Sequence, residues 1–290
     1  MPGPTFYLGA PAPGWLAKAG VPLFVSDTRL RGYKTLPVAV ARWALDSGGF
    51  TQLQKYGDWT VPPAEYVARV RRYRDETGLL DWAAPQDWMC EDAIINGGWY
   101  GGQYFAGTHL TVDEHHRRTV LNVAHLRELA PDLHFIPVVQ GRGPDSHRRC
   151  ADLYWTLAGI DLTREPLVGV GSVCRIQNTA KAGRILTALR SWGLTRMHGF
   201  GFKLEGLNRY GHLLGDQNSA DDGDGGSADS QAWSAWARWA QRPLFPECVG
   251  VHKNCANCLR WALHWRQDAL AAAATPARGE QLEFWEGEAA

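Results

Sequence analysis

Four residues near the C-terminal end have the types and spacing of metal ligands. Cys248, His252, Cys255 and Cys258 place three thiols and one imidazole within a short stretch of chain. Zinc takes such ligands in tetrahedral geometry, and a closed Cys₃His set leaves no position for water. The spacing therefore predicts a structural zinc ion (Zn²⁺) that pins the C-terminal helix. Two alternatives stay open: His264 replaces His252, or the thiols are reduced and buried without a metal.

A second set of polar positions comes directly after apolar runs of the sequence. It combines carboxylates, an amide, an imidazole and glycines: Asp46, Asp87, Gln140, Gly141, Gly169, Gly171, His198, Gly199 and Asp229. If the runs are parallel strands, these positions converge on one face, because active sites of such barrels lie at the carboxyl ends of the strands. We expect a pocket that hydrogen-bonds a flat heterocycle. Taken singly, each position is better explained as an ordinary turn residue or helix N-cap.

The elements that position these residues follow from hydrophobic periodicity. Apolar runs predict eight short strands at Phe6–Leu8, Pro22–Val25, Trp43–Leu45, Leu80–Ala83, Phe135–Val139, Leu167–Val170, Arg196–Phe200 and just before Asp229. Amphipathic patterns between them predict helices, among them one that opens at Pro62-Pro63 and one that a capping box at Thr111 begins. Asn178 is expected to cap a third helix, which ends near Trp192. This alternation is typical of an α/β fold of the (β/α)₈ TIM-barrel type, with an open doubly wound sheet as the rival.

The chain is expected to form a single barrel domain over residues 1–270, with the zinc-binding segment at 246–266. Three segments look like excursions from it: a Gly/aromatic loop at 97–107, an acidic loop at 216–226, and a flexible tail at 271–290. The tail is rich in Ala, Glu and Gly, a composition that favours fraying at a terminus.

Composition excludes several classes of protein. Of 290 residues, 45% are hydrophobic and 21% charged, which is ordinary for a globular chain and argues against disorder. No apolar run is long enough for a membrane span, and the N-terminus lacks the pattern of a signal peptide, so we expect a cytoplasmic protein. Lys plus Arg and Asp plus Glu both number 30. Any phosphate-binding surface must therefore be a local patch, for which Arg142, Arg175 and Lys203 are candidates, with solvated surface charges as the alternative.

Seven stretches spread through the chain carry a family resemblance. They are LDSGGF at 45–50, PQDWMCE at 85–91, PVVQGR at 137–142, VGVGSVCR at 168–175, HGFGFK at 198–203, SADSQAW at 227–233 and HKNCANCLRWALHW at 252–265. Together they resemble the tRNA-guanine transglycosylase superfamily, and most closely its DNA-modifying branch, the deazapurine DNA modification protein (DpdA) family. The resemblance implies a (β/α)₈ barrel with a structural zinc near its C-terminal end, in the cytoplasm of a bacterial or phage-infected cell.

The same resemblance implies a DNA-guanine transglycosylase, a pentosyltransferase that exchanges guanine in DNA for 7-cyano-7-deazaguanine. Asp229 corresponds to the nucleophile and Asp46 to the general acid/base, which also contacts the base. Asp87, Gln140 and the backbone of Gly169–Gly171 correspond to the residues that read the purine edge. Phe50 follows the paired glycines and is expected to stack on the ring. The chemistry follows the two-carboxylate logic of retaining glycosidases, and a guanine within a duplex must be flipped out.

Several alternatives remain at this stage. The sequence Ser-Ala-Asp occurs twice, ending at Asp221 and at Asp229, and we choose Asp229 because a helix begins directly after it. The same chemistry on tRNA is the second functional hypothesis. A hydrolytic glycosylase is the third, and a catalytically inactive, zinc-containing nucleic-acid-binding protein the fourth. Helper proteins of a DNA-modification system are plausible partners for a neutral chain that acts on a polyanion.

Overall fold

The computed structural model describes residues 4–215 and 225–274. Eight parallel strands form one curled sheet in the order β4-β3-β2-β1-β10-β9-β8-β7. Their bounds are Thr5–Gly9 (β1), Leu23–Ser26 (β2), Trp43–Asp46 (β3), Leu80–Ala83 (β4), Val138–Val139 (β7), Val168–Val170 (β8), Met197–Gly199 (β9) and Ser227–Ser230 (β10). These are the eight predicted strands. An isolated parallel bridge also pairs Ala83 of β4 with Phe135, just before β7.

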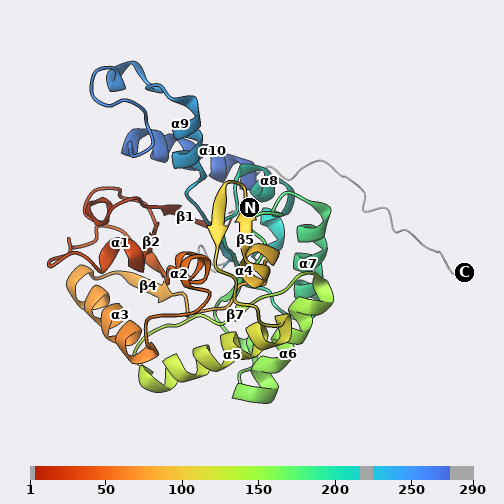
Figure 1. The fold of residues 1–290 in the computed structure, drawn as a ribbon. Helices are drawn as coiled ribbons and strands as arrows, with labels where there is room; N and C mark the ends of the chain where they lie inside the picture. The colour runs from red at the N-terminus through yellow and green to blue at the C-terminus, as the bar shows by residue number, and fades with distance from the viewer. Residues whose placement is uncertain (1–3, 216–224, 275–290) are drawn as a thin grey trace, which may run out of the picture.

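Helices surround the curled sheet, and Figure 1 shows the longer ones, α3, α5, α6 and α7, along its outer side. The bounds are Asp27–Leu30 (α1), Gly49–Tyr56 (α2), Pro63–Thr77 (α3), Asp92–Asn96 (α4), Val112–Leu129 (α5), Pro144–Ala158 (α6), Ala180–Ser191 (α7), Leu204–Tyr210 (α8), Ala232–Ala240 (α9) and Leu259–Ala274 (α10). Short 3₁₀ turns occur at Pro13–Trp15, Leu162–Arg164, Gly211–Leu213 and Pro246–Cys248. Among the described residues, no helix is both long and apolar enough to cross a membrane.

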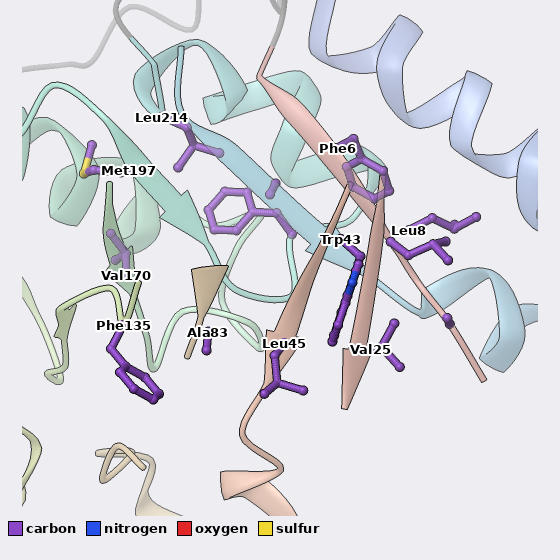
Figure 2. Packing of buried hydrophobic residues seen from close by; sticks show 14 of the residues in the cluster. Phe6, Leu8, Val25, Trp43, Leu45, Ala83, Phe135, Val170, Met197 and Leu214 are labelled. Atoms are coloured by element: carbon purple, nitrogen blue, oxygen red, sulfur yellow. The ribbon is translucent and has the colours of Figure 1, made fainter. Parts of the chain in front are cut away.

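Alternation along the strands builds two apolar layers, because successive side chains of a strand point to opposite faces. In β1, Phe6 and Leu8 belong to the large cluster that packs the sheet against the helices. Figure 2 shows this cluster, with Trp43 and Leu45 of β3 beside them. Tyr7 belongs instead to a smaller cluster inside the curl, with side chains such as Trp82. The register pairs Tyr7 with Asp229, which therefore points to the same inner side.

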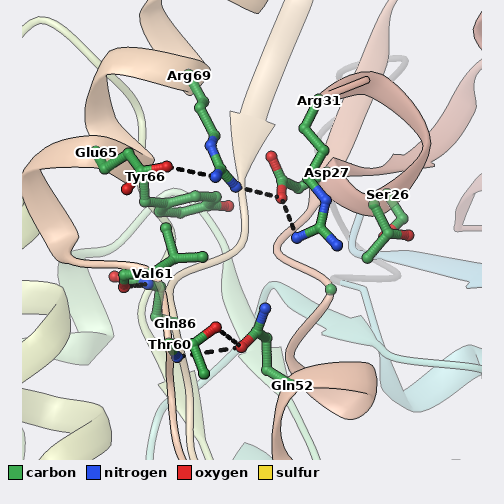
Figure 3. Close-up of polar contacts among 12 residues, drawn as sticks. Ser26, Asp27, Arg31, Gln52, Thr60, Val61, Glu65, Tyr66, Arg69 and Gln86 are labelled. Atoms are coloured by element: carbon green, nitrogen blue, oxygen red, sulfur yellow. Dashed lines mark hydrogen bonds and ion pairs between the residues drawn. The ribbon is translucent and has the colours of Figure 1, made fainter. Parts of the chain in front are cut away.

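Buried polar contacts hold the turn that follows β2 against helix α3. Asp27 is the first residue of α1, and it is almost fully buried. Arg69 of α3 lies 3.0 Å from Asp27 Oδ2, and the Tyr73 hydroxyl donates a 2.7 Å hydrogen bond to Asp27 Oδ1. Figure 3 shows Arg69 and Arg31 converging on this carboxylate. The network ties α3 to the end of β2, next to the residues that form the site.

Some local expectations need correction. The predicted strand Phe135–Val139 is regular only over its last two residues, because Pro137 lacks the N–H that a ladder requires. The N-cap position of α7 is Thr179 rather than Asn178, and the Thr179 side chain makes no capping hydrogen bond. The 97–107 segment is a β-hairpin rather than a loop, with strands Gly98–Tyr100 (β5) and Gln103–Phe105 (β6). Thr111 does cap α5, as its side chain accepts a hydrogen bond from the Glu114 N–H at 3.1 Å.

The expected acidic loop and the expected C-terminal tail lie largely outside the residues that the structure describes. The acidic segment is described only from residue 225 onward, so Asp221 lies outside the described residues. Helix α10 continues to Ala274, and the rest of the expected tail, 275–290, is likewise outside them.

Candidate active site

A cavity of about 300 Å³ lies at the carboxyl ends of the strands. It brings together six of the predicted site residues: Asp46, Phe50, Asp87, Gln140, Gly171 and Asp229. Four others do not line it: Gly141, Gly169, His198 and Gly199. The three carboxylates come from segments far apart in sequence, so the convergence is a product of the curled parallel sheet.

Asp229 lies at the end of β10 with its carboxylate held by two groups. The Gly201 N–H donates a hydrogen bond to Oδ1 at 2.9 Å, and His198 Nε2 lies 3.2 Å from the same oxygen. His198 Nδ1 lies 2.8 Å from Ser227 Oγ, two residues before Asp229. His198 is fully buried, so the structure gives it contact with Asp229 rather than with the cavity.

Asp46 ends β3, and the glycines that follow it shape the wall of the cavity. The Gly48 N–H donates a 3.1 Å hydrogen bond to Asp46 Oδ1. Gly48 has φ of 77°, in the left-handed region that favours glycine. Burial raises the pKa of the Asp46 carboxyl above its usual value, and the charge of Asp229 raises it further, while hydrogen bonds from Ser26 and Gly48 oppose the shift. Asp46 is thus held with a raised proton affinity beside a second carboxylate.

Asp87 lines the same cavity as Asp46 and pairs with an amide. Gln140 Nε2 donates a short hydrogen bond to Asp87 Oδ2, and the Trp59 indole donates to the Asp87 carbonyl at 3.1 Å. Burial, followed by the charge of Asp46, raises the pKa of Asp87 to about 7. A Cβ at Gly49 would lie 2.9 Å from the Trp59 ring and 3.4 Å from Asp87 Oδ1, so glycine here permits the close packing of this wall.

Three further residues line the cavity that the sequence did not single out. Ser172 Oγ lies 2.6 Å from Gln140 Oε1 and 3.2 Å from Glu91 Oε2. Burial raises the pKa of the Glu91 carboxyl, whereas the hydrogen bond with Ser172 and the charge of Arg175 oppose the shift. Arg29 of α1 lines the cavity with no ion pair to any described carboxylate. Glu91 and Ser172 stand inside PQDWMCE and VGVGSVCR, so their presence in those motifs was the signal available.

The glycines that do not line the cavity have packing roles. A Cβ at Gly169 would lie 2.6 Å from the Phe200 ring, and one at Gly199 would lie 2.7 Å from Phe202. One at Gly141 would lie 2.6 Å from the backbone nitrogen of His147. Glycine at these positions lets neighbouring elements approach closely beneath the cavity.

Comparison with models of known protein families shows to which family the chain belongs. A family model described as DpdA, DeoxyPurine in DNA protein A, matches residues 3–286, nearly the whole chain. The chain belongs to the DpdA family. DpdA is a tRNA-guanine transglycosylase-like protein, so the resemblance in the sequence motifs is confirmed. No curated protein matches the chain.

The DpdA-family chain also gathers the predicted metal ligands. One ligand atom from each of Cys248, His252, Cys255 and Cys258 lies within 4.8 Å of all the others. Cys248 Sγ and Cys258 Sγ are 3.8 Å apart, and His252 Nε2 is 3.3 Å from Cys255 Sγ. His264 instead packs against the rings of Phe245 and Trp261. This cluster, in which His252 is the histidine, could hold a metal ion, and none of its four residues lines the cavity.

The three predicted phosphate contacts of the DpdA-family chain differ in availability. Arg142 is already paired with Asp92, at 2.5 Å. Arg175 lines the cavity, lies over the Phe50 ring at 5.9 Å, and has no ion pair to a described carboxylate. Lys203 is exposed, and its backbone N–H is bonded to Gln177 Oε1. Arg175 and Arg29 are therefore the cavity-lining cations that make no close ion pair with a described carboxylate.

Proposed function

We propose that this DpdA-family chain is a DNA-guanine transglycosylase that exchanges guanine in DNA for 7-cyano-7-deazaguanine. The observation that carries the proposal is one cavity that joins Asp46, Asp229 and the Asp87–Gln140 pair. Family membership supports a transglycosylase that acts on DNA. The reaction needs one carboxylate to attack the sugar, another to move a proton and a polar edge to read the base.

Asp229 is the proposed nucleophile. Cleavage of the N-glycosidic bond develops positive charge at C1′ of the deoxyribose, which an adjacent carboxylate stabilises and then captures. The new Asp229 oxygen–C1′ bond forms as the bond to guanine breaks, and the bonding electrons leave with the base. The Gly201 N–H and His198 hold one carboxylate oxygen, Oδ1, and support attack by the other.

Asp46 is the proposed general acid and base. Its raised pKa favours a carboxyl that retains a proton to give to the departing guanine. The resulting carboxylate then removes a proton from the incoming deazaguanine, whose nitrogen attacks C1′ and releases Asp229. Each cycle thus returns both carboxyl groups to their starting states, and no water enters the covalent chemistry.

Asp87 and Gln140 are proposed to read the hydrogen-bonding edge of the purine. A carboxylate accepts from the N–H groups of guanine, and an amide N–H donates to its carbonyl oxygen. Glu91 and Ser172 extend this polar edge, while Phe50 offers a ring for stacking. The same groups suit a 7-deazaguanine, which has the same edge as guanine.

The sulfur-rich cluster is proposed to hold a structural zinc ion. A tetrahedral zinc with bonds to sulfur of about 2.3 Å has ligand atoms about 3.8 Å apart. The 3.8 Å separation of Cys248 and Cys258 fits this geometry. Zinc bound there would brace the start of α10 and take no part in base exchange, because none of the four ligands lines the cavity. We further propose that the curled sheet closes as a (β/α)₈ barrel, which the bridge between Ala83 and Phe135 supports.

Incorporation of labelled base tests the function. Purified protein is incubated with radiolabelled 7-cyano-7-deazaguanine and duplex DNA, single-stranded DNA or tRNA. We expect label in DNA but not in tRNA, and its loss in Asp229→Asn and Asp46→Asn. Label in tRNA alone would support the tRNA enzyme instead, and release of guanine without label would support a hydrolase. Binding without either reaction would support an inactive binder. Activity of the purified chain alone would remove the need for helper proteins.

A further inference from the structure

The β5–β6 hairpin, whose strands are yellow in Figure 1, presents an aromatic pair to solvent. Trp99 and Tyr104 are direct cross-strand partners, with ring centroids 5.8 Å apart. Trp99 is 75% exposed and Tyr104 is 59% exposed. Two large rings side by side leave apolar surface exposed to water, and exposed apolar patches of this kind mark interaction surfaces.

The opposite face of the hairpin explains why the pair is held in place. Tyr100 and Phe105 point to that face, where Phe105 is fully buried in a cluster with side chains of α2 and α4. The turn at Gly101 and Gly102 has positive φ at both residues, which is the two-residue turn that suits a tight hairpin. One face of the hairpin is thus anchored to the protein through Phe105, and the other face, with Trp99 and Tyr104, is exposed to solvent.

The hairpin adjoins the cavity through a chain of ring contacts. Phe105 lies 5.8 Å from Phe50, which lines the cavity. The Arg175 guanidinium lies over both rings, at 5.8 Å from Phe105 and 5.9 Å from Phe50. Gln54 of α2 donates a hydrogen bond to the Tyr104 carbonyl. The hairpin that carries Trp99 and Tyr104 therefore adjoins the cavity wall through Phe105 and Phe50.

The charges in and around the hairpin indicate what kind of ligand it binds. The segment 97–107 contains no Asp, Glu, Lys or Arg. Arg175 at its base and Arg29 in the cavity have no ion pair to any described carboxylate, so they are available for phosphates. Aromatic faces next to unpaired cations are how proteins bind unpaired nucleic-acid strands, with rings stacked on bases and cations on the backbone.

We propose that Trp99 and Tyr104 stack on the unpaired bases of DNA that flank the guanine in the cavity. The proposal rests on the proposed function for its choice of DNA as the polymer. Stacking there would compensate for the base pairing and stacking that are lost when the target guanine leaves the helix. The hairpin would therefore determine affinity for an opened strand, while the carboxylates perform the chemistry.

Binding of a short fluorescein-labelled single-stranded DNA, measured by anisotropy without free base, tests this. Because each stacked base contributes substantially, Trp99→Ala/Tyr104→Ala should bind at least about tenfold more weakly, whereas Trp99→Phe/Tyr104→Phe should stay within about twofold of wild type. Trp155→Ala is the matched control, since Trp155 is 66% exposed on α6 and does not line the cavity. Unchanged melting temperatures would show that every variant is folded.

The outcomes separate this proposal from the proposed function. Equal binding by wild type and the double-alanine variant would overturn the stacking role, even if base exchange is normal. An equal loss of DNA binding in Trp155→Ala would also overturn it. Hairpin-dependent DNA binding without any incorporation of deazaguanine would support the stacking role and overturn the proposed exchange reaction.

Discussion

His198 Nε2 lies 3.2 Å from Asp229 Oδ1, and the His198 ring contacts side chains of the inner layer of the curled sheet, including Tyr7. The His198 ring is fully buried, with the rings of Trp82 and Phe200 4.7 Å and 4.6 Å away. Ser227 Oγ lies 2.8 Å from its other nitrogen. An imidazole enclosed in this way cannot rotate freely, so it fixes the orientation of the carboxylate above it. His198 is thus a positioning residue for Asp229.

Replacing His198 is expected to reduce kcat more than it changes KM. His198→Leu removes the contact with Asp229 and should lower kcat for base exchange about 10- to 100-fold, because a small misplacement of a reacting group is costly. His198→Gln offers an amide N–H near the position of Nε2 and should retain more activity. Steady-state incorporation of labelled base measures both constants. Equal losses in the two variants would indicate a packing defect rather than lost orientation.

The raised pKa of Asp87 predicts a specific dependence of stability on pH. The folded-state pKa is about 7 and the unfolded value is near 3.8, so between these values the folded state binds more protons. The free energy of unfolding contributed by Asp87 is therefore fully present below about pH 4 and is lost as the pH rises through about 7. Asp87→Asn lacks this loss. Relative to wild type, the variant should gain about 2–3 kcal/mol on going from about pH 5 to about pH 8.

Denaturant unfolding of wild type and Asp87→Asn at both pH values measures this difference. Taking the difference between the proteins cancels titrations that they share, including those of the buried histidines His115, His116 and His147. A difference that is the same at both pH values would contradict the assignment of a raised pKa to Asp87.

Much of this arrangement was predictable because short apolar runs and polar residues directly after them are local signals. Parallel strands bring their carboxyl ends together, so Asp46, Asp87 and Asp229 were expected on one face. The depth of His198 was not predictable, because it depends on the register that pairs it with Ser227. One residue along a strand turns a side chain from one face to the other.

Residues on loops escaped the sequence for a different reason. Ser172 adopts φ of 56°, which is uncommon for a residue with a side chain, and this turns its hydroxyl toward Gln140 and Glu91. No local pattern predicts such a conformation, since it is imposed by contacts far along the chain. The hairpin between α4 and α5 was expected as a loop because the segment is rich in glycine. Each of its strands has only three residues, which is too short for an alternating pattern to be recognised.

Loss of a metal ligand is expected to loosen the C-terminal helix and leave the cavity intact. His252→Asn should reduce bound zinc from about one ion per chain to near zero, because structural zinc needs all four ligands. His264→Asn is the matched control, since His264 packs on Phe245 and Trp261 outside the cluster. Metal analysis measures the loss of zinc, and the melting temperature measures the loss of stability. Zinc retained in His252→Asn but lost in His264→Asn would reverse the assignment of the histidine ligand.

Asp27 is expected to be the most sensitive ionic residue of the turn that supports the cavity. Its side chain is 4% exposed and meets Arg69 at 3.0 Å, whereas Arg31, 40% exposed, lies 3.8 Å away. Asp27→Ala should cost about 3–5 kcal/mol of unfolding free energy, because the partly buried Arg69 and the Tyr73 hydroxyl lose their shared acceptor. Arg31→Ala removes only an exposed partner and should cost less than about 1 kcal/mol.

Urea unfolding of the two variants compares these costs directly. Asp27→Ala should also slow base exchange, since Ser26 precedes it and is hydrogen-bonded to Asp46. Similar small losses of stability in both variants would show that the network contributes little and that packing of α3 alone holds the turn. A large loss in Asp27→Ala with unchanged exchange would show that the cavity keeps its shape without this support, so Ser26 and Asp46 would then be held by β2 and β3 themselves.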